Sequence, residues 1–293
     1  MSSVVVRRVL AWYADAGRPL PWREPGTSAW GVLVSEFMCQ QTQVDRVVPS
    51  WRDWMARWPR PSDLAAASPA DAIRAWGRLG YPRRARWLHG AADVIARAWD
   101  DEVPSDADAL LALPGVGEYT TAAVQAFAFG MPSVVLDTNV RRVIARSVDG
   151  QAIPRPSLTH AERDQARALV AAADTEPGRA ARWSQAVMEL GALVCTARSP
   201  DCAHCPIARQ CTWQRAGAPA ADWAPRRQAA FHGSDRQARG RVMAILREAA
   251  HPVPASVIED AIDDPAQRER ALRGLVADGL VVRNAVGDYV LPT

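Results

Sequence analysis

The sequence predicts an all-α protein that ends in a small domain of three helices and a β-hairpin. Apolar residues and arginines recur at helical spacing through most of the 293 residues, whereas β-branched alternation is scarce before residue 280. Turn signals such as Pro114–Gly115 and Ser199–Pro200 separate stretches of helix length. With 48% hydrophobic residues, the chain can bury proper cores in two or three domains.

The expected helices follow one another along the chain. The first eighteen residues form an amphipathic helix that contains arginines and has no apolar core of the kind found in signal peptides. Capping residues are expected at two later helix starts, namely Ser68 before a proline and Asp137 or Thr138 before an amphipathic run. Further helices are expected over 29–48, 69–79, 83–98, 106–112, 118–129, 138–147, 159–173 and 179–194.

The C-terminal part is predicted to be a linker and a compact tail. Residues 216–234 are rich in Ala, Pro and Gly, which is typical of a linker. The tail, 235–293, is expected to hold helices over 235–250, 254–264 and 266–279 and a hairpin over 280–291, an order that predicts a winged-helix-like domain. Its last helix carries Arg268, Arg270 and Arg273. They could contact phosphates, although their alternation with acidic residues favours a solvated face.

The charged residues exclude one class of chemistry. The net charge is only +3, and the chain contains no lysine, so every basic side chain other than histidine is arginine. This composition is interpreted mainly as a coding bias. Whatever the origin of this composition, no lysine side chain is present to serve as a nucleophile or form a Schiff base.

No run of about 18 apolar residues exists. We therefore expect no membrane contact and a cytoplasmic location.

Four of the five cysteines stand close together near the end of the helical body. Their spacing is Cys195-x6-Cys202-x2-Cys205-x5-Cys211. This spacing favours one 4Fe–4S cluster, because zinc sites more often pair two C-x2-C knuckles across a longer gap. Zinc, disulfides and a site without any metal remain the alternatives. The fifth thiol, Cys39, is interpreted as a small core residue.

Two acidic residues, Glu36 and Asp137, are candidates for acid–base catalysis. Glu36 lies in a helix that is apolar on nearly all faces, so burial would raise its pKa and let it act as a general acid. A solvated surface glutamate is the alternative. Asp137 follows an apolar run at the point where a new helix begins. It could cap that helix, take part in catalysis, or do both.

Two further segments suit contact with DNA. The turn Leu113-Pro-Gly-Val-Gly117 precedes an expected helix. Its backbone N–H groups could hold one phosphate, unless it is an ordinary helix–helix turn. Gln40, Gln41 and Thr42 form an uncharged polar cluster that suits base edges or, alternatively, a polar rim.

The cysteine loop, the LPGVG turn and Asp137 together resemble the helix-hairpin-helix DNA glycosylases, which have the endonuclease III fold. The resemblance covers about residues 8–215. It implies a two-lobed helical fold with an iron–sulfur loop. The blocks that resemble the adenine glycosylase (MutY-type) branch are Leu20-Pro-Trp-Arg23, Ser35-Glu36, Gln40-Gln-Thr-Gln43, Leu79-Gly-Tyr81 and Glu189-Leu-Gly-Ala-Leu-Val-Cys195. The implied division is a cluster lobe of 1–24 plus 134–215 and a six-helix lobe of 25–133, followed by the linker 216–234 and the tail 235–293.

This resemblance also implies an activity. Members of the branch remove adenine mispaired with 8-oxoguanine or guanine in duplex DNA and carry one 4Fe–4S cluster. We accordingly expect a monomer that works in the cytoplasm at the nucleoid. The implied cluster ligands are Cys195, Cys202, Cys205 and Cys211. A basic loop beside them, with Arg198 and Arg209, is expected to contact backbone phosphates.

Catalytic roles carry over to matching positions. Glu36 resembles the acid that protonates adenine N7, and Asp137 resembles the carboxylate that stabilises the oxocarbenium ion of the sugar. Asn139 matches a residue near N7 and the catalytic water. Tyr119 stands where relatives with lyase activity place a Schiff-base lysine, so we expect a monofunctional glycosylase with little or no lyase activity. The lysine-free composition agrees with this.

Binding roles carry over in the same way. Gln40 and Tyr81 resemble side chains that fill the stack after the adenine has left, and Gln41 resembles one that touches the opposite purine. The implied adenine-pocket residues are Trp22, Arg23, Gln185 and Met188. The implied DNA-binding residues are Gln40, Gln41, Thr42, Tyr81, Leu113, Gly115, Val116 and Gly117.

The sequence departs from this branch in two places. Typical members end in a larger Nudix-like domain that contacts 8-oxoguanine, whereas only 235–293 follow the linker here. This puts a strong 8-oxoguanine preference in question and leaves adenine excision intact. Pro82 also replaces an aromatic residue.

One alternative function is that of a sister-branch glycosylase for thymine or oxidised pyrimidines, which Tyr119 and the Gln40–Gln41 pair oppose. The other is a non-catalytic iron–sulfur DNA-binding regulator.

Overall fold

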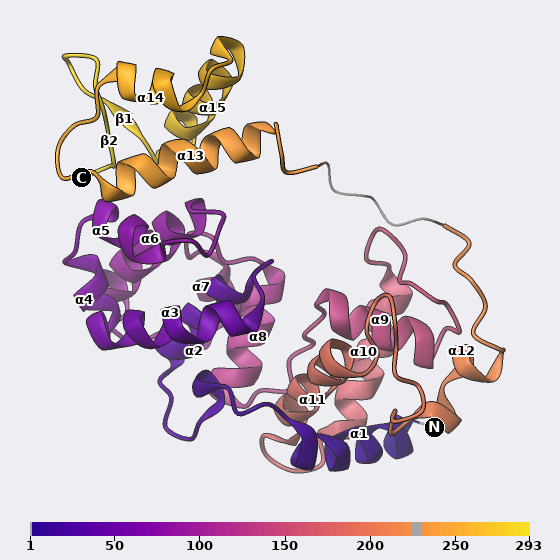
Figure 1. Ribbon diagram of the computed structural model, residues 1–293. Helices are drawn as coiled ribbons and strands as arrows, with labels where there is room; N and C mark the ends of the chain where they lie inside the picture. The colour runs from indigo at the N-terminus through magenta and orange to yellow at the C-terminus, as the bar shows by residue number, and fades with distance from the viewer. Residues whose placement is uncertain (1, 224–229) are drawn as a thin grey trace. The chain divides into compact units, whose positions relative to one another are not determined.

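The computed structural model describes residues 2–223 and 230–293, whose regular secondary structure is almost entirely helical (Figure 1). The predicted all-α class is confirmed. These residues form two compact units by their mutual contacts. Within the described residues, the first unit contains 2–36, 105–112 and 116–223, and the second contains 37–104, 113–115 and 230–293. The domain boundaries expected from the sequence differ from these and stay a prediction.

The first unit is organised around helix α11 (Arg179–Leu193). Helices α1 (Ser2–Ala16), α9 (Thr138–Ser147) and α10 (His160–Ala173) pack against it. Their facing apolar side chains, among them Val9, Val143 and Leu190, form a common core. The other elements of this unit are η1 (Pro21–Arg23), α7 (Ala107–Leu111), α8 (Glu118–Phe129), η2 (Ala208–Gln210) and α12 (Thr212–Arg215).

The second unit has a core rich in tryptophan. Trp54 lies edge-on to Trp58 and to Trp76, with ring centroids 4.6 and 5.7 Å apart. The helices that supply and cover these rings are α3 (Val44–Arg57), α4 (Pro61–Ala65), α5 (Pro69–Trp76) and α6 (Arg83–Ala98). The expected cap of α5 is present, because the Ser68 hydroxyl accepts the Asp71 N–H at 3.1 Å.

The helix predicted over 29–48 is wrong at its C-terminal end. Helix α2 covers only Ala29–Cys39, and Gln41 has a left-handed backbone with φ 55°. The cause lies far along the chain, since the Arg84 guanidinium donates hydrogen bonds to the carbonyls of Phe37 (2.8 Å), Met38 (3.2 Å) and Gln40. It thereby satisfies the last carbonyls of α2 and ends the helix. The helix Val44–Arg57 follows, with Pro49 inside it, and the prediction covers only its residues 44–48.

The tail contains the expected elements with shorter bounds. They are α13 (Asp235–Glu248), α14 (Ala255–Ala261), α15 (Pro265–Ala277), β1 (Val282–Arg283) and β2 (Tyr289–Val290). The two strands pair antiparallel, with Val282 opposite Val290, and Val253 adds an isolated bridge to Tyr289. The assignment of this domain as a winged helix stays a prediction.

Part of the predicted linker is attached to the first unit. The Trp223 indole donates a hydrogen bond to the Pro154 carbonyl at 3.3 Å, and the Arg155 guanidinium lies over the same ring. Residues 224–229 of the linker lie outside the described residues. Within the ranges 2–223 and 230–293, no helix is long and apolar enough to cross a membrane.

Candidate active site and metal centre

Glu36 is a buried carboxyl group on α2. Its residue is only 7% exposed, in a helix whose neighbouring residues Val34, Phe37 and Met38 are fully buried. Burial raises the pKa of Glu36 to about 7, helped by the nearby charge of Asp137, while a hydrogen bond with Tyr119 and the charge of Arg23 lower it. The prediction that apolar surroundings enclose Glu36 is confirmed. A carboxyl group with this pKa is half protonated near neutral pH and can donate a proton.

Asp137 stands at the N-terminus of α9. Its Oδ1 atom accepts the Val140 N–H at 2.6 Å, and its Oδ2 atom accepts the Asn139 amide at 2.8 Å. Burial raises the pKa of Asp137 above its ordinary value, and the hydrogen bonds from Val140 and Asn139 oppose this shift only in part. The predicted cap is therefore present. The structure also brings Asp137 close enough to Glu36 for their charges to interact.

A further set of contacts holds Asn139. The Arg142 guanidinium donates to the Asn139 Oδ1 atom and to the Gly191 carbonyl, both at 2.7 Å, and to the Cys195 carbonyl at 2.7 Å. A Cβ atom at Gly191 would lie 2.7 Å from the Asn139 Cβ atom, so only glycine lets α11 approach this closely. The Asn139 amide is thereby oriented with its NH₂ group toward Asp137.

Glu189 is a functional candidate that the sequence reasoning missed. It is completely buried on α11, and its carboxylate accepts hydrogen bonds from Arg18 and Arg23, with Arg23 Nη1 at 2.9 Å. Burial alone would raise the pKa of Glu189, but these two guanidinium groups outweigh it and lower the pKa. Glu189 therefore fixes the segment that carries Trp22 and Arg23 to helix α11.

Replacing Glu189 with Gln should lower the free energy of unfolding by about 3 kcal/mol, because two guanidinium groups lose a buried counter-charge. Arg18 keeps 31% of its side chain exposed, so we expect the low end of the range for a broken buried pair. Thermal unfolding of the full chain should show a melting temperature lower by roughly 6–12 °C.

The matched control for this substitution is Glu118→Gln. The Glu118 carboxylate pairs with Arg163 at 3.0 Å, but its side chain is 74% exposed. A surface pair of this kind contributes less than about 1 kcal/mol. Equal losses in the two variants would contradict the structural importance of Glu189.

An open cavity of about 280 Å³ lies beside this ion pair. It is lined by Tyr13, Gly17, Arg18, Arg23 and neighbouring residues of the same segment. The Tyr13 hydroxyl donates to the Gln185 Oε1 atom at 3.3 Å, which places Gln185 near the same segment. Trp22 is buried in η1, and Met188 is half-buried against the core on α11. The four predicted adenine-pocket residues thus share the first unit with Glu36 and Asp137.

The predicted DNA-binding residues belong mostly to the second unit. Gln41 and Tyr81 are exposed and have left-handed backbones, with φ 55° and 49°. Gln40 is half-buried. Thr42 is buried, and its hydroxyl donates to the Leu79 carbonyl at 3.0 Å, which gives it a structural contact instead of a free polar group.

The LPGVG turn is shaped by its glycines. A Cβ atom at Gly115, whose φ is 77°, would lie 2.7 Å from the Trp87 Cβ atom and 2.9 Å from the Phe37 ring. Only glycine fits there. Leu113 and Val116 are buried, and Gly117 is the N-cap of α8, whose first N–H groups can bind an anion.

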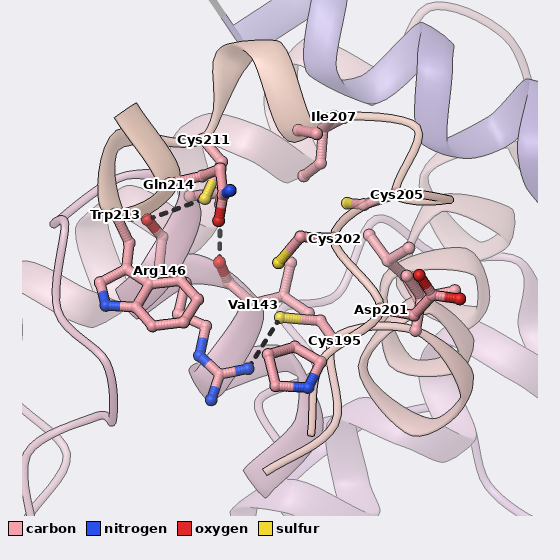
Figure 2. A pocket seen from close by; sticks show the side chains of 15 residues that line it. Val143, Arg146, Cys195, Asp201, Cys202, Cys205, Ile207, Cys211, Trp213 and Gln214 are labelled. Atoms are coloured by element: carbon pink, nitrogen blue, oxygen red, sulfur yellow. Dashed lines mark hydrogen bonds between the residues drawn. The ribbon is translucent and has the colours of Figure 1, made fainter. Parts of the chain in front are cut away.

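The four clustered cysteines line one cavity. Figure 2 shows the sulfur atoms of Cys195, Cys202, Cys205 and Cys211 around a common space, walled by apolar side chains such as Val143 and Ile207. Arg146 Nη1 lies 3.4 Å from the Cys195 Sγ atom. All four thiols are free, so the described residues contain no disulfide among them.

The geometry of these thiols bears on the kind of metal they could bind. Burial raises the pKa of Cys205 to about 11, so its thiolate needs nearby positive charge. In the part of the chain that the structure describes, no three His, Cys, Asp or Glu side chains are grouped closely enough to hold a single metal ion. In a 4Fe–4S cluster each thiolate ligates a different iron, so the ligands need not converge on one point.

Residues 34–166 match the family model described as HhH-GPD superfamily base excision DNA repair protein. The adenine DNA glycosylase of Mycobacterium tuberculosis is 50% identical over 285 residues, which cover 97% of this chain and 92% of that protein. The human adenine DNA glycosylase is 38% identical over 212 residues, or 69% of this chain and 38% of that one. The structure of a thermostable thymine-DNA glycosylase is 25% identical with a TM-score of 0.64, covering 73% of this chain and 97% of that chain.

Proposed function

This chain belongs to the HhH-GPD superfamily of base excision DNA repair proteins, among its adenine DNA glycosylases, and we propose that it hydrolyses the N-glycosidic bond of adenine mispaired with 8-oxoguanine or guanine. The observation that carries the proposal is the buried Glu36 carboxyl group, with a pKa of about 7, next to Tyr119 and Asp137. Two neighbouring carboxyl groups, one of them able to donate a proton near neutral pH, suit the cleavage of a glycosidic bond.

The proposed reaction uses the two carboxyl groups in different forms. Protonated Glu36 donates its proton to N7 of an adenine that has been flipped out of the duplex, which makes the base a better leaving group. The bond between the sugar and adenine then breaks, and the Asp137 carboxylate stabilises the positive charge that develops on the sugar. Water then adds to the sugar cation and gives up a proton to the Glu36 carboxylate, which restores the acid. Asn139, held by Arg142, keeps Asp137 oriented and lies near the base.

The side chains around these groups have supporting roles. Trp22, Arg23, Gln185 and Met188 would line the adenine pocket, and Glu189 would hold Arg23 in it. The Tyr119 side chain has no amine and cannot form a Schiff base, and the sequence contains no lysine. Excision should therefore leave an abasic site without cleaving the strand, because β-elimination through a lysine adduct is not available.

Duplex DNA would be held by the exposed residues of the second unit and by the LPGVG turn. Tyr81 and Gln40 would fill the stack that the adenine leaves, and Gln41 would touch the opposite purine. The backbone N–H groups that follow Gly117 would bind one phosphate. We expect a monomer that acts on the chromosome, in the cytoplasm.

One 4Fe–4S cluster is the cofactor that the cysteine cavity fits best. Cys195, Cys202, Cys205 and Cys211 would hold it, and the Arg146 guanidinium beside Cys195 would offset part of its negative charge. The cluster would supply structural cross-links, and no step of the reaction above depends on it. The Cys195 carbonyl, which accepts a hydrogen bond from Arg142, connects the loop to the residues that hold Asp137.

A set of duplexes with one mispair each tests the proposal. We expect adenine release from A:8-oxoguanine and A:G pairs but not from A:T pairs, and strand breaks only after alkali. Release of thymine from a T:G pair without adenine release would favour the sister-branch activity instead. Tight binding with no base release would favour a DNA-binding regulator. Borohydride trapping of a covalent DNA adduct would contradict the monofunctional mechanism.

A further inference from the structure

The tail contacts α6 through one acidic residue at the end of α15. Asp278 Oδ1 lies 3.4 Å from Arg83 Nη1, and the Asp278 carbonyl accepts a hydrogen bond from Arg86 Nη1 at 2.9 Å. The Asp278 carboxylate also pairs with Arg239 of α13. Asp278 therefore joins the first turns of α6 to two helices of the tail.

The end of α15 has the shape needed to receive Arg86. Gly279 has φ 64°, a backbone conformation that favours glycine. A Cβ atom at this position would lie 2.6 Å from the Arg86 guanidinium. Glycine thus allows both the turn and the close approach of α6. Helix α13 in addition packs against α5, so the tail contacts two consecutive helices of the second unit.

These two helices flank the loop that presents Tyr81. The loop runs from Gly77 to Pro82, between the end of α5 and the start of α6, and Tyr81 is 45% exposed with φ 49°. A left-handed backbone at a bulky residue persists only where its surroundings hold it. Here Trp76 and Arg84 hold it, because both donate hydrogen bonds to the Gly80 carbonyl, at 2.9 and 3.1 Å. Trp76 ends α5 and Arg84 lies in the first turn of α6, so the loop depends on both helices.

The arginines of α15 argue against a direct role in DNA binding. Arg270 pairs with Asp235 at 3.0 Å, Arg273 with Glu269 at 3.4 Å and Arg268 with Glu259 at 3.9 Å. Each positive charge on this helix thus has an acidic partner, and no uncompensated basic stripe results.

We propose that the C-terminal tail acts as a brace, that is, it holds in place the loop that presents Tyr81 to DNA. It does so by packing against α5 and the first turns of α6, chiefly through the contacts of Asp278 and Arg86. Asp278 is a positioning residue in this account. The proposal rests on the glycosylase function above only for the role of Tyr81 in base flipping. The mechanical link from the tail to the loop does not depend on it.

Hydrogen exchange of the full chain without DNA tests the mechanical link. In Asp278→Ala and in Arg86→Ala, amides of residues 77–84 should exchange about tenfold faster or more than in the unsubstituted chain. Asp263→Ala, which removes an exposed acid of the same tail, is the control and should leave them unchanged. Unchanged exchange of residues 77–84 in both test variants would overturn the proposal. This holds even if residues 235–293 exchange faster, because the loosened tail would then have no effect on the loop.

A fluorescence measurement tests the consequence for DNA. A duplex with 2-aminopurine in place of the mispaired adenine brightens when the base leaves the stack. We expect Asp278→Ala to slow this rise about threefold to tenfold, with a change in Kd of less than about twofold. Tighter binding with a steeper salt dependence would instead show that the arginines freed by this substitution bind phosphates, and an unchanged rate of fluorescence rise would overturn the proposal. Because the exchange measurement includes neither DNA nor base release, failure of the proposed glycosylase function would leave its result intact.

Discussion

Glu36→Gln should slow the release of adenine by about 10²–10⁴-fold in single-turnover reactions, because the amide cannot donate a proton to the leaving base. Affinity for mispaired DNA should change little, since Gln has the same size and can still hydrogen-bond to the Tyr119 hydroxyl. Glu176→Gln, which alters an exposed acid of the same unit, is the control and should release adenine at the normal rate. Normal base release by Glu36→Gln would rule out the proposed general acid.

The pH dependence of the unsubstituted chain follows from the same group. Glu36 must be protonated to act, and its pKa is about 7. The rate of base release on bound DNA should therefore fall as the pH rises through about 7, close to tenfold per pH unit at higher pH. Glu36→Gln should lack this decline. A profile that rises through pH 7 would show that Glu36 is needed as a base.

Burial of Glu36 also makes a prediction for stability. The folded-state pKa of about 7 lies above the ordinary value of 4.5, so the folded chain binds a proton more tightly than the unfolded one. The contribution of Glu36 protonation to the free energy of unfolding is fully present below pH 4.5 and is lost as the pH rises through 7. The loss amounts to about 3 kcal/mol. Glu36→Gln should therefore melt at a higher temperature at pH 8 and show little gain at pH 5. This outcome would also demonstrate that its inactivity is not a folding defect.

The structural settings of the two proposed catalytic residues could be predicted from local sequence patterns. An acid in an almost fully apolar helix predicted the burial of Glu36, and an acid between an apolar run and an amphipathic run predicted the cap at Asp137. The same pattern occurs at Glu189, in a run of Ala, Val, Met and Leu, and would have identified it as a buried acid. Its partners could not be inferred, because Arg18 and Arg23 precede it by 171 and 166 residues.

The end of α2 illustrates what local patterns do not contain. Apolar periodicity continues through Val44 to Val48, so the sequence predicts one helix. The chain instead turns at Gln41, a residue type that carries no signal for a left-handed backbone. The turn is fixed by Arg84, more than forty positions later, whose buried guanidinium binds the free carbonyls of α2. Tertiary contacts of this kind override local propensity.

Asp137→Asn should slow adenine release by about 10²–10³-fold, because a neutral amide cannot stabilise the positive charge that develops on the sugar. Asparagine is as good an N-cap as aspartate, so its Oδ1 atom can still accept the Val140 N–H. Its NH₂ group would, however, face the NH₂ group of Asn139, where the carboxylate oxygen now accepts a bond of 2.8 Å. This lost hydrogen bond should lower the free energy of unfolding by only about 1 kcal/mol.

The large loss of rate and the small loss of stability separate the two roles of Asp137. Asp106→Asn is the control, because the Asp106 carboxylate caps α7 by accepting the Ala109 N–H at 2.9 Å and belongs to the same unit. Single-turnover release and thermal unfolding should be measured for both variants. If Asp137→Asn retained more than about a tenth of the rate, Asp137 would be a helix cap alone. The sugar cation would then have to be stabilised by another group, such as the Glu36 carboxylate that remains once its proton has passed to the base.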